Sequence, residues 1–183
     1  SGCLERQIFP TSFRNRNAGI LGDIINSDLF FVRSLNFSYD GLVAGTPGQA
    51  TYYNFTQANE SRTPVIYTGA NDGMLHAFNA DTGVELFSYV PSVVYSKLSA
   101  LTSSNYTHRY IVDGNTYAGD AYIGATPSWK TILLGTTGGG GKGIFALDIT
   151  DPTNFTASNV MWEFTDADLG FVHGQAKIAL LND

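Results

Sequence analysis

Cysteine is almost absent from this chain of 183 residues, since Cys3 is the only one. An internal disulfide and a zinc site built from several cysteines are therefore both excluded. Charge is scarce as well, at 14% of residues, and ten Lys and Arg against sixteen Asp and Glu give a net charge of −6. Because a mildly acidic chain is poorly suited to phosphate backbones, we expect no nucleic-acid partner. No apolar run approaches the ~20 residues of a transmembrane helix, so we expect no membrane span.

Short runs rich in Val, Ile, Thr, Tyr and Phe, broken by Gly, Asn and Asp, dominate what is present and predict β-strands. A first group of runs occupies 64–67, 74–78 and 84–89, and a second group occupies 131–135, 143–148 and 160–164. The two groups match in order: Gly69 corresponds to Gly135, Gly73 to Gly143, Ala77 to Ala146, and Leu86-Phe87 to Met161-Trp162. The chain thus contains an internal repeat.

One more strand is predicted at the start of each unit, at 22–25, at 119–123, and at 174–178 for a third unit. Four-stranded antiparallel units repeated every ~40–50 residues are typical of a β-propeller. We therefore predict an all-β fold, a partial β-propeller of about two blades plus the start of a third, over residues 19–183. Because the last apolar strand has no following partner, we expect a fragment of a larger domain, preceded by a leader segment over residues 1–18.

Two insertions enlarge the first unit. One of them, 91–113, begins with apolar residues that fall on one face and predict one short helix over 91–101. The other, Asn36 to Arg62, is polar and rich in Tyr and Asn. Long loops on a rigid scaffold often carry binding, and binding loops are often rich in these residues, so this insertion is the candidate partner surface.

The stretch with Gly138, Gly140 and Gly143 formally satisfies the Gly-x-Gly-x-x-Gly pattern. A dinucleotide site needs a helix after this pattern, because the helix N-terminus faces the pyrophosphate. Here an apolar strand follows at 144–147, and Gly143 stands where a Walker-type phosphate loop needs Ser or Thr. We therefore predict a hairpin connection and no nucleotide site.

The titratable residues favour structural roles. His76 occupies the strand position that Phe145 fills in the second unit, so we expect a packed, hydrogen-bonded histidine. Asp166 and Asp168 supply too few oxygens for a hard cation, which needs ~6–8, so we expect a turn in which Asp caps backbone amides. No residue is assigned as catalytic, cofactor-binding or metal-binding.

These units resemble the blade repeat of quinoprotein-type propellers, in which an Asp-x-Thr-Gly turn precedes a strand that ends in Trp. Residues 78–83, Phe-Asn-Ala-Asp-Thr-Gly, match that turn well. The predicted four-stranded blades are therefore quinoprotein-like. Phe87, Tyr89 and Trp162, near the ends of the outer strands, are expected to pack between neighbouring blades.

A closer resemblance covers most of the chain, from about Gly19 to Leu181, in consistent order. It is carried by five segments, at 21–28, 67–78, 89–92, 106–114 and 162–170. These segments resemble the C-terminal propeller of the type IV pilus tip-associated adhesin and biogenesis family (PilY/PilC). Five motifs in the same order make the resemblance specific.

The resemblance implies a non-enzymatic, pilus-associated protein that supports type IV pilus biogenesis and surface adhesion. Members are secreted by Gram-negative bacteria, which implies passage through the periplasm and an extracellular or cell-surface location. The partners it implies are minor pilins or pilus tip components, together with a host surface ligand. The family's Asp-rich calcium loop lies in a later blade and has no counterpart in this chain. We therefore expect no cofactor in this segment, and calcium only in the parent protein beyond Asp183.

Two alternatives stay open. A pyrroloquinoline-quinone-dependent dehydrogenase shares the blade repeat, although this chain lacks the adjacent-cysteine pair that many alcohol-oxidising members carry. A propeller assembly lipoprotein needs an acylated cysteine at its mature N-terminus. Cys3 resembles such a residue superficially, but no signal segment accompanies it.

Overall fold

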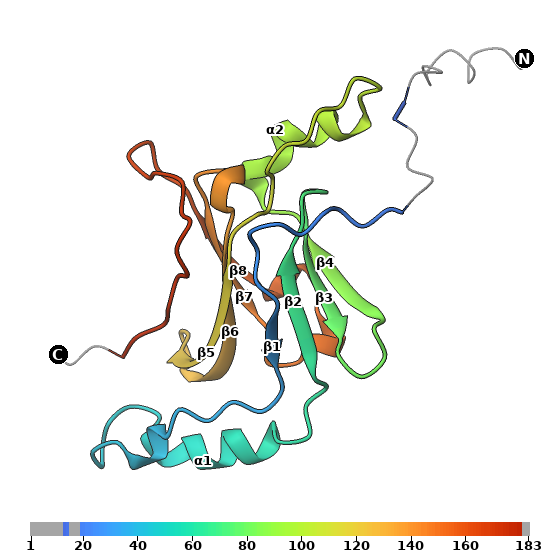
Figure 1. The fold of residues 1–183 in the computed structure, drawn as a ribbon. Helices are drawn as coiled ribbons and strands as arrows, with labels where there is room; N and C mark the ends of the chain where they lie inside the picture. Colours follow the sequence, from blue (N-terminus) through green and yellow to red (C-terminus); the bar gives the residue numbers. More distant parts are fainter. Residues whose placement is uncertain (1–12, 15–18, 181–183) are drawn as a thin grey trace, which may run out of the picture.

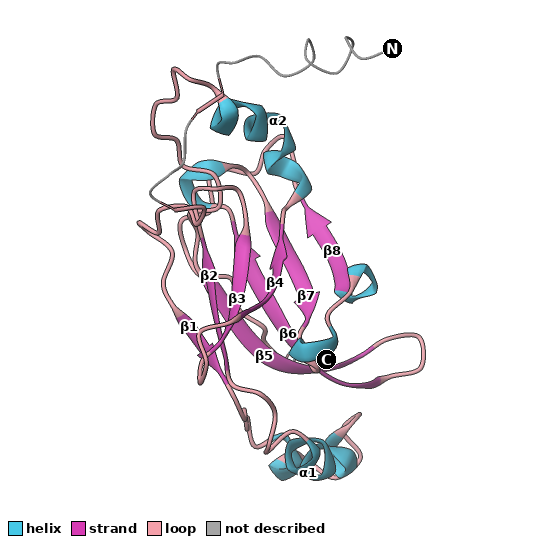
Figure 2. Cartoon of the chain, turned by 90° about the vertical axis from the view of Figure 1, so that its right-hand side faces the viewer, coloured by secondary structure: helices cyan, strands magenta, loops and turns pink. Residues whose placement is uncertain are grey.

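Two four-stranded antiparallel sheets lie face to face (Figures 1 and 2). This computed structural model describes residues 13–14 and 19–180, so most of the leader predicted over 1–18, Cys3 included, lies outside the described residues. The first sheet holds β1 (Phe30–Val32), β2 (Val65–Gly69), β3 (Leu75–Asn79) and β4 (Glu85–Tyr89). The second holds β5 (Thr116–Ile123), β6 (Ser128–Thr136), β7 (Ile144–Asp148) and β8 (Val160–Phe164). Each strand pairs with the next along the chain, as expected for propeller blades.

The strand register confirms the internal repeat. Ala77 lies opposite Phe87 in the first sheet, and Ala146 lies opposite Trp162 in the second. In both sheets the register shifts directly after this alanine, so the two outer strands carry a bulge at the same place. The two sheets are therefore built on one pattern.

The strands predicted at 22–25 and 174–178 are both wrong. Residues 22–25 form no strand, and β1 lies further along the chain at Phe30–Val32. A hydrogen bond to a loop side chain fixes the start of the 22–25 segment. Gly22 N donates to Asp72 Oδ2 at 2.6 Å, and a Cβ on Gly22 would lie 2.3 Å from Asp72 N. The second segment pairs with no strand among the described residues. It is held by its side chains, because Gln175 Nε2 donates to the Thr116 carbonyl at 2.8 Å.

The core lies between the two sheets, and Phe145 is central to it. This ring is 1% exposed and fits over Gly135, where an added Cβ would lie 2.2 Å from the ring. Tyr89 of the first sheet packs against it, with ring centroids 5.1 Å apart. Phe145 and His76 occupy the same strand position in the two sheets. Gly135 lies opposite Phe145 and Thr68 lies opposite His76, so the counterpart of Gly135 is Thr68 and not the neighbouring Gly69 that the sequence predicted.

Phe87 and Tyr89 pack between the two blades as predicted, whereas Trp162 does not. Phe87 stacks on Phe155 with ring centroids 3.8 Å apart. Trp162 and Phe164 are 45% and 50% exposed on β8, because no further sheet covers them among the described residues.

The 36–62 insertion contains η2 (Tyr39–Gly41) and α1 (Gln49–Ala58), which cross one end of the sheets (Figure 1). The sequence of this stretch predicts no helix, because its Thr, Tyr and Asn residues have modest helix propensity. Packing overrides propensity: Tyr52 of α1 is 0% exposed.

At the opposite end of the sheets, the helix predicted over 91–101 is confirmed in a broken form (Figure 1). It consists of η3 (Ser92–Val94), α2 (Tyr95–Leu98) and η4 (Ser99–Thr102). Three further turns, η5 (Gly138–Gly140), η6 (Pro152–Asn154) and η7 (Ala157–Asn159), connect strands of the second sheet. None of the helices within the described ranges has the length and apolarity that a bilayer crossing requires.

Candidate partner-binding surface

A buried polar network fastens the insertion to the second sheet. Its centre is Asp120 of β5, which is 2% exposed. The Tyr52 hydroxyl donates to Asp120 Oδ2 at 2.7 Å, and the Thr131 hydroxyl donates to Asp120 Oδ1 at 2.8 Å. Arg62, at the end of the insertion, donates from Nη1 to the Thr131 hydroxyl at 2.9 Å. The helix α1 and the C-terminal end of the insertion thus converge on one carboxylate, Arg62 by way of Thr131.

The charges of this network are strongly desolvated. Burial raises the pKa of Asp120 above its usual value, and the hydrogen bonds from Tyr52 and Thr131 and the positive charge of Arg62 offset this only in part. Burial likewise lowers the pKa of Arg62, against the opposing effect of Asp120. Because each buried charge offsets the desolvation of the other, the network holds the insertion in one place.

An aromatic cluster around Trp129 completes this attachment. Its ring centroid lies 4.5 Å from that of Tyr52, 5.3 Å from that of Tyr39 and 5.4 Å from that of Tyr122. Trp129 Nε1 also donates to the Gly48 carbonyl at 2.9 Å. Gly48 has φ +82°, and a Cβ there would lie 2.6 Å from Tyr122, so only glycine fits this approach.

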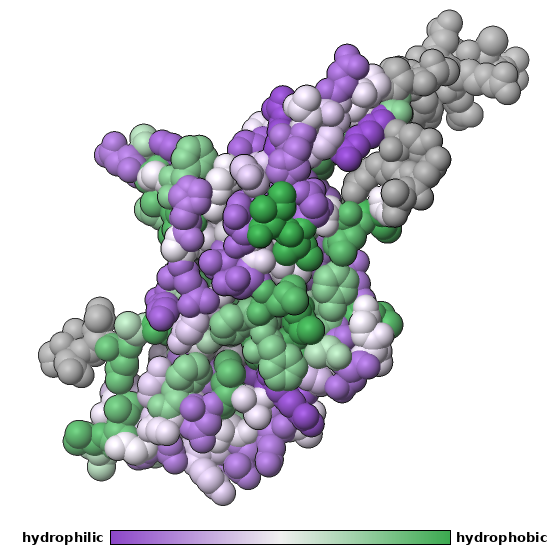
Figure 3. Space-filling model, viewed as in Figure 1, coloured by the Kyte–Doolittle hydropathy of each residue, from purple (hydrophilic) through white to green (hydrophobic). Residues whose placement is uncertain are grey.

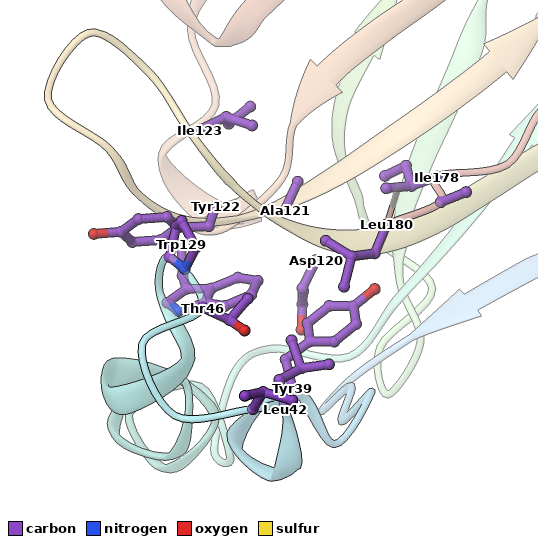
Figure 4. Close-up of a pocket in the computed structure, with 13 residues that line it drawn as sticks. Tyr39, Leu42, Thr46, Asp120, Ala121, Tyr122, Ile123, Trp129, Ile178 and Leu180 are labelled. Atoms are coloured by element: carbon purple, nitrogen blue, oxygen red, sulfur yellow. The ribbon is translucent and has the colours of Figure 1, made fainter. Parts of the chain in front are cut away.

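A cavity of about 580 Å³ opens between the insertion, the β5–β6 hairpin and the segment 178–180 (Figure 4). This volume lies within the ~300–1,000 Å³ of typical ligand pockets. Its apolar walls include Leu42, Val43, Ala121, Ile123, Ile178 and Leu180. Asp120 is the one residue with a formal charge among the described residues that line it.

The surface around the cavity is partly hydrophobic. Val43 is 81% exposed and Leu180 is 54% exposed. On the face shown in Figure 3, hydrophobic side chains gather over the middle of the molecule and again at the lower left, toward the C-terminal segment and the insertion. Exposed apolar surface beside a formed cavity is typical of an interaction site.

The predicted candidate, the Asn36–Arg62 insertion, therefore supplies one wall of the cavity. The sequence did not predict the walls that β5, β6 and the segment 178–180 supply. Asp120 and Trp129 lie on strands and contact Tyr52 of the insertion, which is distant in sequence. The one local signal is that Asp120 stands among apolar strand residues, where a carboxylate is unusual.

A second titratable cluster lies at the other end of the sheets and contains His76, which is 4% exposed. His76 Nδ1 lies 2.6 Å from Glu85 Oε1, and Nε2 lies 3.1 Å from Asp72 Oδ2. Burial alone would lower the pKa of His76, but hydrogen bonds to the two carboxylates outweigh it and raise the pKa above 6.5. Burial alone would raise the pKa of Asp72, but the bonds from His76 and Gly22 N hold it below 3.8. The prediction of a packed, hydrogen-bonded histidine is confirmed.

This cluster predicts a pH-dependent stability. The contribution of protonated His76 is present in full below 6.5 and is lost as the pH rises through its raised pKa. That of ionised Asp72 is present in full above 3.8 and is lost as the pH falls through its lowered pKa. We therefore expect the free energy of unfolding in urea to fall as the pH rises above 6.5 and passes through the raised pKa of His76. In the variant His76→Gln this fall should be absent, and an equal fall in both proteins would contradict the assignment.

The glycine pattern and the pair of Asp166 and Asp168 have the structural roles predicted for them. Gly138–Gly140 form η5 and lead into β7, so the glycine pattern is a strand connection. Asp168 N donates to Asp166 Oδ1 at 2.8 Å, which makes that pair part of a turn. His108 Nε2 lies 2.6 Å from Asp23 Oδ2. Over residues 13–14 and 19–180, no group of three or more His, Cys, Asp or Glu side chains is placed to hold a metal ion.

A family model and two curated relatives point to the same family. The model of the PilY1 beta-propeller domain matches residues 21–180. A type IV pilus biogenesis factor PilY1 homolog of Xylella fastidiosa is 45% identical over 161 residues, which cover 88% of this chain and 13% of that protein. The type IV pilus biogenesis factor PilY1 of Pseudomonas aeruginosa PAO1 is 40% identical over 179 residues, which cover 94% of this chain and 15% of that protein.

A solved structure agrees with these relatives. The crystal structure of the Pseudomonas aeruginosa PilY1 C-terminal domain superposes with a TM-score of 0.61 at 35% sequence identity. The match covers 81% of this chain and 28% of that domain, so the chain spans a small part of its relatives. Because the family model spans nearly the whole chain and the fold agrees, this chain belongs to the PilY1 β-propeller domain family.

Proposed function

We propose that this chain is a non-enzymatic platform within a protein that supports type IV pilus biogenesis and surface adhesion. The observation that carries the proposal is the insertion, which is locked to the second blade through Asp120 and bears a cavity with an exposed apolar rim. Relatives named as type IV pilus biogenesis factors, at 40% and 45% identity, supply the biological setting.

The partners we propose are minor pilins or other pilus tip components, with a host surface ligand as a further one. The protein would cross the periplasm and act at the surface of a Gram-negative cell. We propose no cofactor for this segment, and a calcium site only in the parent protein. The clustered polar groups support a structural reading, because Asp120, His76 and Asp72 each hold chain segments together through hydrogen bonds.

The test is genetic. Deleting the parent gene should leave few or no surface pili by electron microscopy, with dye-linked alcohol dehydrogenase activity of the same cells unchanged. Normal pili with lost dehydrogenase activity would overturn the proposal in favour of a quinoprotein enzyme.

Complementation then addresses the surface itself. The variant Val43→Lys places a charge on the cavity rim, at a residue that is 81% exposed and so tolerates it for folding. Burying an unpaired charge against a partner costs more than ~1.4 kcal/mol, or about tenfold in affinity, so this variant should restore fewer pili. The control Val84→Lys, in the β3–β4 turn at 61% exposed, should restore them fully. Equal restoration by both variants would remove the insertion from the proposed contact surface.

A further inference from the structure

We propose that the cavity beside the insertion binds a basic side chain of a partner protein, an ammonium group on an aliphatic stem, with Asp120 as its acceptor. The inference rests on the proposed contact role of the insertion and adds the chemistry of the group that is bound. It follows from the apolar walls of the cavity, the stacking of its aromatic rings and the carboxylate of Asp120 in its lining.

The walls suit a long apolar stem. Leu42 of the insertion faces the cavity from one side, and Ile178 and Leu180 line it from another (Figure 4). At about 580 Å³ the cavity exceeds a single side chain, so it also has room for the flanking backbone of a peptide. Leu180 at the rim is 54% exposed, which leaves apolar surface for that backbone to cover.

The aromatic rings at the cavity are already stacked with one another. Tyr39 stacks on Phe37, with ring centroids 5.8 Å apart and 20° between the planes, and on Trp129, with 5.3 Å and 14°. These two contacts take up ring surface of Tyr39 that a flat ligand would need. Stacking of a sugar or of another flat ring needs a free face, so these rings favour a ligand that is bound by its end group.

The charge at the base selects a cation. Asp120 receives one hydroxyl donor on each oxygen, from Tyr52 and Thr131, although a carboxylate accepts about four hydrogen bonds. Arg62 reaches it only through the Thr131 hydroxyl, and no direct ion pair to Asp120 occurs among the described residues. An incoming ammonium supplies up to three donors and a direct ion pair, which Arg62 does not form, whereas an anion would meet a carboxylate in a lining without a basic residue.

Trp129 is a built-in reporter for this binding. The chain has two tryptophans, and replacing the exposed Trp162 by Phe leaves Trp129 in the cavity wall as the sole emitter. We would titrate this variant with three probes of similar size: the N-acetyl methylamides of lysine, norleucine and glutamate. Lysine and norleucine share the aliphatic stem, so the difference between them isolates the ammonium group.

The lysine probe should bind at least about tenfold more tightly than norleucine, which corresponds to one charge-assisted hydrogen bond, and glutamate should not bind. Asp120→Asn keeps the size and one carbonyl acceptor, and should bring lysine down to the norleucine level. Asp40→Asn removes an exposed carboxylate of the same insertion outside the cavity lining and should change nothing. Leu42→Ala shortens the stem contact and should weaken lysine and norleucine equally.

Equal binding of lysine and norleucine, binding of glutamate, or no binding of any probe would each overturn the inference. If Asp120→Asn alters the circular dichroism of the fold, Leu42→Ala and the three-probe comparison in the unaltered cavity still decide the matter. Failure here is separable from failure of the proposed function, because an added cation at Val43 disfavours an apolar and a basic contact alike, so pilus counts with Val43→Lys report the contact surface whichever of these groups the cavity selects.

Discussion

Replacing Phe145 with alanine is expected to lower the free energy of unfolding by about 3–5 kcal/mol, the usual range for a buried Phe. The ring is 1% exposed, lies over Gly135 and contacts Tyr89 of the other blade, so its loss opens a cavity at the blade interface. Gly135 has no side chain that could fill this cavity. A larger residue at that position would fit only in the absence of the Phe145 ring and after repacking of the strand. A small domain is stable by only about 5–15 kcal/mol in total, so the effect should be plain in urea unfolding.

Phe164→Ala is the matched control for this prediction. It removes the same ring from a neighbouring strand, but from a position that is 50% exposed, so the loss should be below ~1 kcal/mol. Equal losses in the two variants would mean that the two sheets do not share a core around Phe145. Circular dichroism and tryptophan fluorescence should report the same midpoint for each variant if the two blades unfold together.

Local patterns were enough to predict the outer three strands of each blade. Turn residues such as Gly73 and Gly83, with φ +97° and +72°, punctuate short β-branched runs, and these are signals within a few residues of one another. The inner strand of the first blade was misplaced for the opposite reason. Phe30–Val32 is a strand because it pairs with β2, from which the whole insertion separates it in sequence. Because the strand partner lies so far away in the sequence, residues 30–32 alone carry no alternating pattern that would predict a strand.

Of the three segments that form the cavity, the sequence predicted only the insertion as part of a site, and not the β5–β6 hairpin or residues 178–180. The Tyr and Asn content of the insertion singled it out, but α1 forms because Tyr52 and Phe55 pack on Trp129, a residue of the other blade. The role of Asp120 likewise depends on hydroxyls and a guanidinium supplied from elsewhere in the chain. Tertiary contacts of this kind decide which polar residues are buried, and a single sequence does not encode them in any short segment.

The dependence of the insertion on Asp120 leads to the second large effect. Asp120→Ala should destabilise the protein by about 3–5 kcal/mol, because it leaves Arg62 as a buried charge without its counter-charge. Arg62 is 9% exposed and donates to the Arg33 carbonyl and to Thr131, so it cannot reach water without breaking these bonds. Asp40→Ala, at an exposed carboxylate of the same insertion, is the control and should change stability by less than ~0.5 kcal/mol.

A double-mutant cycle with Arg62→Met separates this explanation from simple loss of contacts. If the cost of Asp120→Ala arises from an uncompensated charge, removing that charge as well should recover part of it, and the double variant should be more stable than the sum of the two single losses implies, by about 1–3 kcal/mol. Additive losses, measured by urea unfolding of the four proteins at one pH, would instead mean that Asp120 and Arg62 stabilise the insertion independently. The carboxylate would then be held by the hydroxyls of Tyr52 and Thr131 alone, and the insertion would be anchored at two separate points.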